Sequence, residues 1–522
     1  MTTIVNEASI RMTNDFTSQL AANIWGHRFT TGQRGPEYVL EFLNVLYGTK
    51  YNLNASEYDR KKAIGLRKFI FEGAKEGSRR DTVILDEVHK RKIYETLDNE
   101  DDVEVLRDFL RNLEVIIYNA NGKVTDRSWF VKMLYPLHES LLFFELRTNK
   151  NSISFERNFF ARGGELYYLM LAYGTENDHI TRQFIERRFK ELLQANKVIE
   201  KVVNKLNAAL DEDEDAKPLK LKSDSGDDNV PWLPALDLNL YVEFAKEIKA
   251  LISLNIDINE FFQLLNSQIC FHLMRYMFDR VGAAEKNIFF FDCMDGANQH
   301  ISLLSSKTFA DHESLVKFGF EAEFENKFNK VIGNEEEGLR DFLDWKEDPD
   351  LFLKKLGLSK LGSKRKQQIS SALIKSKEYS DLKKKVYEVI KEAVTEQMKK
   401  NQLGITKILA RDGGIANYRT GNSYRYIISD YFLQTLVYVN VNPKESIEFS
   451  EFLDLLYKKY NFVIGEAQAK NSGLYERSKL NIRYFQQNEK HLRDKLKQNG
   501  LLIEFSDATA MIRNPYEAWE CE

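Results

Sequence analysis

The sequence predicts a mainly α-helical, multi-helical protein with minor β structure and a winged-helix-like domain at its C-terminal end. Eight prolines and 26 glycines among 522 residues leave long stretches free of helix breakers. Apolar residues recur at helical spacing through much of the chain. Near the C-terminus, three helical patterns precede two short β-like runs, which is the element order of a winged helix.

Residues 1–210 form the first predicted domain, which is helical. Within Glu37–Leu46, apolar side chains follow a helical stripe, and Pro36 precedes them at a first-turn position where its missing N–H costs nothing. Two further stretches repeat the helical pattern, at 102–116 and 183–210. Two short runs resemble β-strands, at 82–85 and 114–118.

Residues 211–231 predict an exposed acidic and polar linker. The stretch begins with five consecutive acidic residues and then mixes Lys, Ser, Gly, Asp and Pro. Such a composition buries too little apolar surface to offset the entropy of ordering the chain. A solvated linker is therefore the favoured interpretation, and mimicry of nucleic acid is the alternative.

Residues 232–404 form the second predicted domain, which is also mostly helical. Glu260–Met277 is strongly apolar and indicates a buried helix, and Asn287–Phe291 indicates a strand. Residues 354–400 are helical and basic, with 14 lysines and arginines against five acids, a local balance of +9.

Residues 405–522 form the third predicted domain. Helices are expected over 429–440, 449–460 and 481–498, the last stopped by Gly500, and strands over 501–505 and 509–513. This order predicts the winged-helix-like domain.

The bulk composition excludes several classes of protein. The formal net charge of −4 gives no global attraction to nucleic acid or anionic lipid, so such binding needs a local patch. The three cysteines, Cys270, Cys293 and Cys521, are far apart, which fits a reducing compartment and excludes a Cys-only zinc site. The polar N-terminus and the short apolar runs predict a cytoplasmic protein without membrane contact.

The run from Phe155 to Glu165 is the first candidate site. Gly163 and Gly164 precede a helical stretch, where backbone N–H groups and the helix dipole attract an anion, and Arg157 and Arg162 supply forked guanidinium groups for a phosphate. The favoured alternative is a junction between two helices, with the glycines as the turn and Glu165 in the first turn of the next helix.

Asp292, Asp295 and His300 form the second candidate site, directly after the expected strand. Carboxylates at the carboxyl end of a strand are placed to hold Mg²⁺ for phosphoester chemistry. The spacing fits no established motif, and Asp-Gly and Asn residues are ordinary turn formers, which favours the turn. The sequence carries no HExxH, GxSxG, nucleotide-binding GxGxxG or kinase signature.

Basic side chains form the third and fourth candidates, as contacts to nucleic-acid phosphates. A solvated face of charged helices is the alternative. The residues in the basic segment are Lys364, Arg365, Lys366, Lys383, Lys384 and Lys385. Those in the third domain are Arg419, Arg425, Arg493 and Lys497, the first two in an aromatic-rich run that suits protein interfaces equally.

The run FERNFFARGGE and the C-terminal stretch from NYRTGNSYRY to SDATAMIRNPY are similar to accessory subunits of bacterial antiviral (anti-phage) defence systems. The resemblance covers about a quarter of the chain. It implies a large helical subunit that works beside an ATPase, helicase or nuclease on foreign DNA.

The leading hypothesis is therefore a non-enzymatic accessory or scaffold subunit of a bacterial defence or DNA-processing complex. It docks protein partners and, as a further partner, DNA, and it needs no cofactor. The alternative is a Mg²⁺-dependent nuclease or phosphotransferase that uses Asp292 and Asp295.

Overall fold

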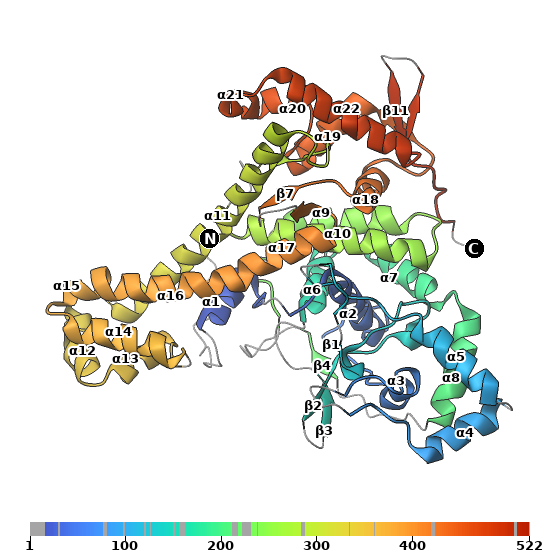
Figure 1. The fold of residues 1–522 in the computed structure, drawn as a ribbon, viewed down its shortest axis with the longest axis horizontal. Helices are drawn as coiled ribbons and strands as arrows, with labels where there is room; N and C mark the ends of the chain where they lie inside the picture. Colours follow the sequence, from blue (N-terminus) through green and yellow to red (C-terminus); the bar gives the residue numbers. More distant parts are fainter. Residues whose placement is uncertain are drawn as a thin grey trace.

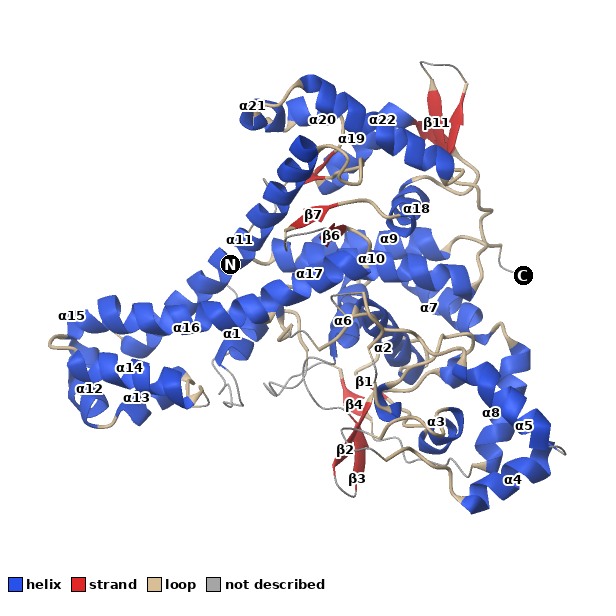
Figure 2. Ribbon diagram, in the orientation of Figure 1, coloured by secondary structure: helices blue, strands red, loops and turns tan. Residues whose placement is uncertain are grey.

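The computed structural model describes most of the chain and shows a mainly α-helical protein with a few short strands (Figure 2). The description covers residues 16–520, apart from the following gaps: 30–31, 77–80, 98–99, 120–121, 126, 150–151, 156–161, 211–217, 222–230, 237–238, 283–287, 334, 360, 419–422 and 506–508. Arg157, Arg419 and most of the expected linker lie outside the described residues.

The first segment is helical, as expected. Its helices are α1 (Phe16–Trp25), α2 (Gly35–Gly48), α3 (Ile64–Ile70), α4 (Glu87–Leu97), α5 (Glu100–Arg111), α6 (Gly163–Gly174), α7 (His179–Gln194) and α8 (Lys197–Ala209). Two short 3-10 turns lie between α5 and α6, η1 (Trp129–Val131) and η2 (Glu139–Leu141). Strands β2 (Leu146–Asn149) and β3 (Ser152–Phe155) form an antiparallel hairpin.

The two β-like runs of this segment do not form strands. Thr82 makes a single bridge to Lys75, and the 114–118 run makes single bridges at its two ends, to Leu134 and Val124. Backbone hydrogen bonds flank these bridges, such as the Val83 N–H to the Ala74 carbonyl at 2.8 Å and the Val115 N–H to the Met133 carbonyl at 2.9 Å. Within the described residues, however, neither run forms a strand.

The described part of the expected linker is ordered against the first segment. Residues Leu219–Lys220 form β4, which pairs antiparallel with β1 (Glu57–Tyr58). Leu221 is fully buried and its N–H donates to the carbonyl of Ser56. Leu219 and Leu221, two residues apart, therefore attach this end of the stretch to the first segment. The acidic residues around them hid this alternation in the sequence.

Helix α10 (Ile258–Asp279) runs through the centre of the protein (Figure 1). Asp257 caps its first turn, and most of its side chains are buried on all sides, as the sequence predicted for this stretch. It packs against α2, α9 (Asn239–Ile252), α17 (Gln402–Asp412) and α18 (Asp430–Asn440). His272 lies inside this core.

An arm of helices projects from this centre (Figure 1). The 34-residue helix α11 (Gln299–Ile332) forms its length and α16 (Tyr387–Lys400) runs beside it. The far end holds α12 (Glu335–Glu347), α13 (Pro349–Leu356), α14 (Ser363–Lys375), α15 (Tyr379–Asp381) and the π-helical turn η4 (Leu382–Val386). The expected basic segment, 354–400, thus covers helices at the far end of this arm and the whole of α16, which runs beside α11.

The C-terminal elements are α18, β8 (Ser446–Glu448), α19 (Phe449–Tyr460), β9 (Phe462–Val463), α20 (Glu466–Asn471), α21 (Leu474–Ser478), α22 (Ile482–Gln498), β10 (Leu502–Glu504) and β11 (Ala510–Arg513). The three helices and two strands predicted near the C-terminus appear as α18, α19, α22, β10 and β11, and the structure adds β8, β9, α20 and α21, which the sequence did not predict. Strands β10, β11 and β8 form one antiparallel sheet in that order. Before them, β6 (Ala416–Tyr418) and β7 (Tyr424–Tyr426) form a hairpin.

The main hydrophobic core takes side chains from many parts of the described chain between Leu20 and Ile512, and two smaller cores lie beside it, one within the first segment and one around Phe290 and Phe485. Strand β5 (Phe289–Phe290) pairs in parallel with β9, so the expected strand before Asp292 joins the C-terminal elements to the middle of the chain. Within the described residues, no helix has the length and apolar character that crossing a bilayer requires.

Candidate nucleic-acid interface

Helix α22 is the longest helix of the C-terminal region and has clear end signals. The Asn481 side chain accepts a hydrogen bond from the N–H of Arg483 at 3.0 Å, which caps the first turn. Gly500 follows the last turn with a φ of +70°, a left-handed conformation that glycine adopts at little cost. These signals fix where the helix begins and ends.

The inner face of α22 is clamped to the ends of two strands. Asn488 is fully buried; its side-chain amide donates to the carbonyls of Phe291 at 2.8 Å and Ile464 at 3.0 Å. Its side-chain oxygen accepts from the N–H of Cys293 at 2.9 Å. One side chain thus satisfies three backbone groups and sets the rotation of the helix about its axis.

The opposite face of α22 is polar, basic and exposed over four turns. It carries long side chains that donate hydrogen bonds, and three cations oppose one acid. The exposed residues are Arg483, Gln486, Gln487, Lys490, His491, Asp494, Lys497 and Gln498. Among the described residues, no ion-pair partner faces Arg483 or Lys490. Arginine, lysine and glutamine side chains are among those that contact phosphates in protein–DNA complexes.

The hairpin of β10 and β11 is tied to α22 by one carboxylate. Glu504 on β10 accepts from Arg493 at 3.0 Å and from Lys497 at 2.8 Å. The lysine lowers the pKa of the Glu504 carboxyl, and the carboxylate raises the pKa of Lys497. Two cations predicted to contact nucleic acid therefore already share an acidic partner.

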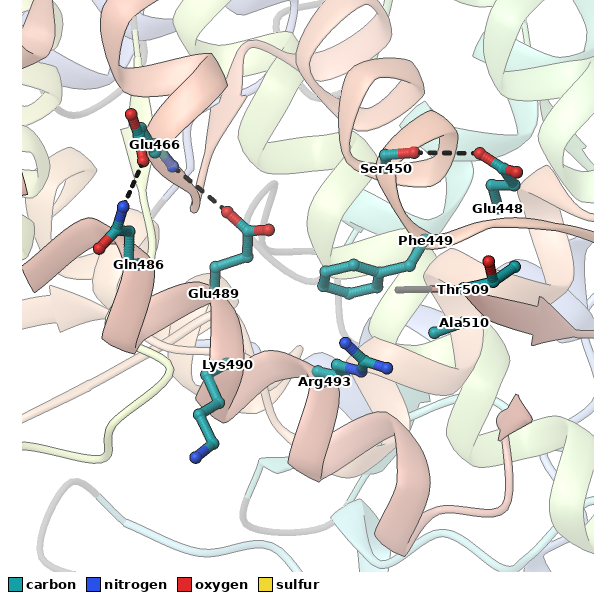
Figure 3. A pocket seen from close by; sticks show the side chains of 10 residues that line it. All are labelled: Glu448, Phe449, Ser450, Glu466, Gln486, Glu489, Lys490, Arg493, Thr509 and Ala510. Carbon is teal, nitrogen blue, oxygen red and sulfur yellow. Dashed lines mark hydrogen bonds between the residues drawn. The ribbon is translucent and has the colours of Figure 1, made fainter. Parts of the chain in front are cut away.

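A pocket of about 450 Å³ lies between α22, the starts of α19 and α20, and β11 (Figure 3). Glu466 accepts a hydrogen bond from Gln486 at 2.7 Å, and its N–H donates to Glu489 at 3.3 Å. Burial raises the pKa of the Glu489 carboxyl. Lys490 and Arg493 also line this pocket, and the Lys490 side chain extends away from Glu466 and Glu489 (Figure 3). The pocket thus combines three carboxylates, those of Glu448, Glu466 and Glu489, with two cations of α22.

Asp292 follows β5 as the sequence predicted, but its carboxylate is engaged within the protein. It is fully buried and forms an ion pair with Arg425, the Nε to Oδ2 distance being 3.1 Å. Ser302 donates to the same oxygen at 2.7 Å, and the N–H of Met294 donates to Oδ1 at 3.0 Å. Here the carboxylate stabilises a turn and holds β7 to the start of α11.

The other two residues of this candidate point elsewhere. Asp295 is exposed, and its carboxylate pairs with Lys495 of α22 at 2.9 Å. His300, in the first turn of α11, stacks on Tyr484 of α22 at 5.0 Å between ring centres. In the part of the chain that is described, no three His, Cys, Asp or Glu side chains gather to hold a metal ion.

The first candidate site contains internal carboxylates in the place expected for an external anion. Gly163 and Gly164 lie in the first turn of α6, and the Gly164 N–H donates to the Glu41 carboxylate of α2 at 2.8 Å. Arg162 is buried and pairs with Glu165 at 2.6 Å. The Glu41 and Glu165 carboxylates thus occupy the place at this helix end that was predicted for an external anion.

The glycines serve close packing instead of forming a turn. A Cβ on Gly164 would lie 2.5 Å from the backbone nitrogen of Phe42, and a Cβ on Gly163 would lie 1.9 Å from the Tyr38 ring. The prediction of a turn at these glycines is therefore wrong, because both residues belong to α6. The placement of Glu165 in the first turn of that helix is confirmed.

The basic residues of the arm divide into paired and unpaired ones. Arg365 lies against Glu396 and Glu392 of α16, and Lys385 pairs with Asp381 at 3.0 Å. Lys364, Lys383 and Lys384 are exposed and Lys366 is half-buried. No ion pair of these four lysines occurs within the described ranges, and their contact with nucleic acid stays a prediction.

Sequence reasoning missed the two cations of α22 that have no acidic partner in the described structure. Arg483 and Lys490 stand seven residues apart, on the side opposite Phe485 and Leu492. The helical period of the buried residues marks that face. The local density of charge in the sequence instead pointed to Arg493 and Lys497 as nucleic-acid contacts, and in the fold both pair with Glu504.

Comparison with known proteins adds no relative, since no protein-family model, curated protein or solved structure matches this chain.

Proposed function

We propose that this chain is a non-enzymatic adaptor subunit that docks duplex DNA through the exposed face of α22. The observation that carries the proposal is that face, with Arg483, Gln487 and Lys490 projecting from a helix whose rotation Asn488 fixes. Phosphate contacts by cations supply affinity, and glutamine side chains suit base edges in the major groove.

The topology around α22 supports the same reading. A helix, a strand, further helices and then a hairpin that pairs with the first strand, in sheet order β10-β11-β8, is the arrangement expected of a winged helix. In that arrangement the last helix enters the major groove and the hairpin lies beside the backbone. The hairpin here carries Glu504, which shields part of the positive charge of α22.

The complex in which the adaptor works is proposed from the sequence resemblance alone. We place it in a bacterial defence or DNA-processing assembly, beside an ATPase, helicase or nuclease. Co-purification of the tagged chain with the products of its neighbouring genes tests that part, and a chain that elutes alone would contradict it.

The DNA-docking proposal predicts that Arg483→Ala combined with Lys490→Ala weakens binding to a 20-base-pair duplex about 10-fold or more. Each lost phosphate contact should reduce the slope of log affinity against log salt by about 0.9. Fluorescence anisotropy from about 50 to 200 mM salt measures both quantities. Lys458→Ala, an exposed lysine of α19, is the matched control and should bind as the parent does.

A second variant should act in the opposite direction. Glu504→Ala releases Arg493 and Lys497, so DNA binding should tighten several-fold and its salt slope should steepen. Unchanged binding in both variants would contradict the placement of DNA on α22.

A further inference from the structure

The outer end of the arm carries a second exposed positive surface, which we call the arm tip and define by Lys375, Lys377, Lys383 and Lys384. All four lysines are exposed, and they lie within ten residues around the turn formed by α15 and η4. In the described structure none of them forms an ion pair. The nearby Asp381 is engaged with Lys385 at 3.0 Å and with the N–H of Lys377 at 2.7 Å.

Helix α11 joins this surface directly to α22. At its first turn, His300 stacks on Tyr484, the neighbour of Arg483. At its last turn, the carbonyl of Ile332 accepts a hydrogen bond from Tyr379 of α15 at 3.0 Å. Figure 1 shows α15 at the far end of the arm and α22 near the opposite end of α11.

The separation between the two surfaces follows from helix geometry. The 32 steps along α11 from His300 to Ile332, at a rise of about 1.5 Å each, place its two end contacts about 48 Å apart along the helix axis. B-form DNA rises about 3.4 Å per base pair, so this distance corresponds to about 14 base pairs.

The arm is braced along its length, so the separation is fixed. Phe320 stacks on Trp25 of α1 at 6.4 Å, and Phe324 stacks on Tyr387 of α16 at 5.4 Å. Glu321 accepts from Thr395 at 3.1 Å, and Lys407 of α17 pairs with Glu313 at 2.9 Å. Helices α1, α16 and α17 thus all contact α11 between Glu313 and Phe324.

We infer that the protein binds duplex DNA at two points, with α22 at one and the arm tip at the other, about 14 base pairs apart. This inference rests on the proposed function of α22. Exposed lysines act as point charges that neutralise phosphates without reading sequence, so the arm tip adds affinity and salt dependence.

The test compares duplexes of 10 and 24 base pairs by fluorescence anisotropy on the full-length protein. The shorter duplex reaches only one surface, and the longer one spans both. The parent should bind the longer duplex at least 10-fold more tightly, with a salt slope steeper by about 0.9 for each lysine that contacts a phosphate.

A fourfold lysine-to-glutamine variant at the arm tip should abolish this gain and leave binding of the 10-base-pair duplex unchanged. The matched control carries the same four changes at exposed lysines elsewhere, Lys190, Lys201, Lys205 and Lys246, and should keep the gain. A gain that survives in the arm-tip variant, or a parent without any gain, overturns the two-point inference. If the parent binds neither duplex, the proposed function itself is overturned.

Discussion

Single buried polar side chains in this protein are satisfied by partners that are distant in the sequence. Glu247 is an example, because its carboxylate contacts His272 at 2.7 Å, Lys459 at 3.0 Å and the Tyr460 hydroxyl at 3.0 Å. Burial opposes its charge, but these partners lower the pKa of Glu247 far below its usual value. His272 itself is completely buried in the core.

His312 gives a pH-dependent prediction at this scale. It is buried against Phe278 and Phe289, its Nδ1 lies 2.6 Å from the Tyr426 hydroxyl, and burial lowers its pKa to about 3. Because the unfolded chain takes up a proton near pH 6.5, this contribution to stability is complete above that pH. It is lost as the pH falls from about 6.5 toward 3.

Between pH 7 and pH 5, His312 should therefore account for about 2 kcal/mol of lost stability. In urea unfolding, the free energy of unfolding of His312→Asn should fall by about 2 kcal/mol less than that of the parent between pH 7 and pH 5. Tyr426→Phe keeps the histidine buried and should retain the parental dependence on pH. An equal pH dependence in the His312 variant and the parent would contradict burial as the cause.

At the scale of elements, the close approach of α2 and α6 requires glycine at positions 163 and 164. Helices α2 and α6 touch through Gly163 and Gly164, and the Glu41 carboxylate of α2 accepts from the first turn of α6. Burial raises the pKa of Glu41 well above its usual value, against the hydrogen bonds from Gln33 and Gly164. A glycine pair that suits an anion loop in sequence serves helix packing in the fold.

Gly164→Ala should destabilise the protein by about 2 kcal/mol or more, because the new methyl group meets backbone atoms that cannot move aside. Gly362→Ala is the control, since a Cβ there meets nothing within 4 Å, and it should cost less than about 1 kcal/mol. Chemical denaturation measures both. Equal free energies of unfolding of the two variants would contradict a steric cost of a Cβ between α2 and α6.

At the scale of the whole molecule, the hydrophobic core crosses the boundary predicted at residues 404 and 405. Phe291 packs on Phe432 at 6.2 Å and on Phe462 at 4.6 Å between ring centres. A smaller core joins Phe290 and Ile301 to Phe485. The C-terminal elements thus share their interior with the middle of the chain.

A fragment of residues 405–522 should therefore fail to fold alone. Without β5, it leaves Phe432, Phe462 and Phe485 without the rings that cover them, and β9 loses its paired strand. Its amide NMR spectrum should show the narrow dispersion of an unfolded chain, and urea should produce no cooperative transition. A dispersed spectrum with cooperative unfolding would establish an independent C-terminal domain.

The sequence by itself determined the helical class and five of the C-terminal elements, α18, α19, α22, β10 and β11, because apolar periodicity and the stop at Gly500 are local signals. It also located the strand before Asp292. Only the tertiary structure decided which charges remain exposed, because an ion pair depends on what the fold brings alongside. Asp292 meets Arg425, 133 residues away, and Glu504 meets Arg493 and Lys497. Arg483 and Lys490 face solvent because Phe485, Asn488 and Leu492 pack inward. The helical spacing of those three residues marks this face, but only the long-range contacts show which cations of α22 meet an acidic partner.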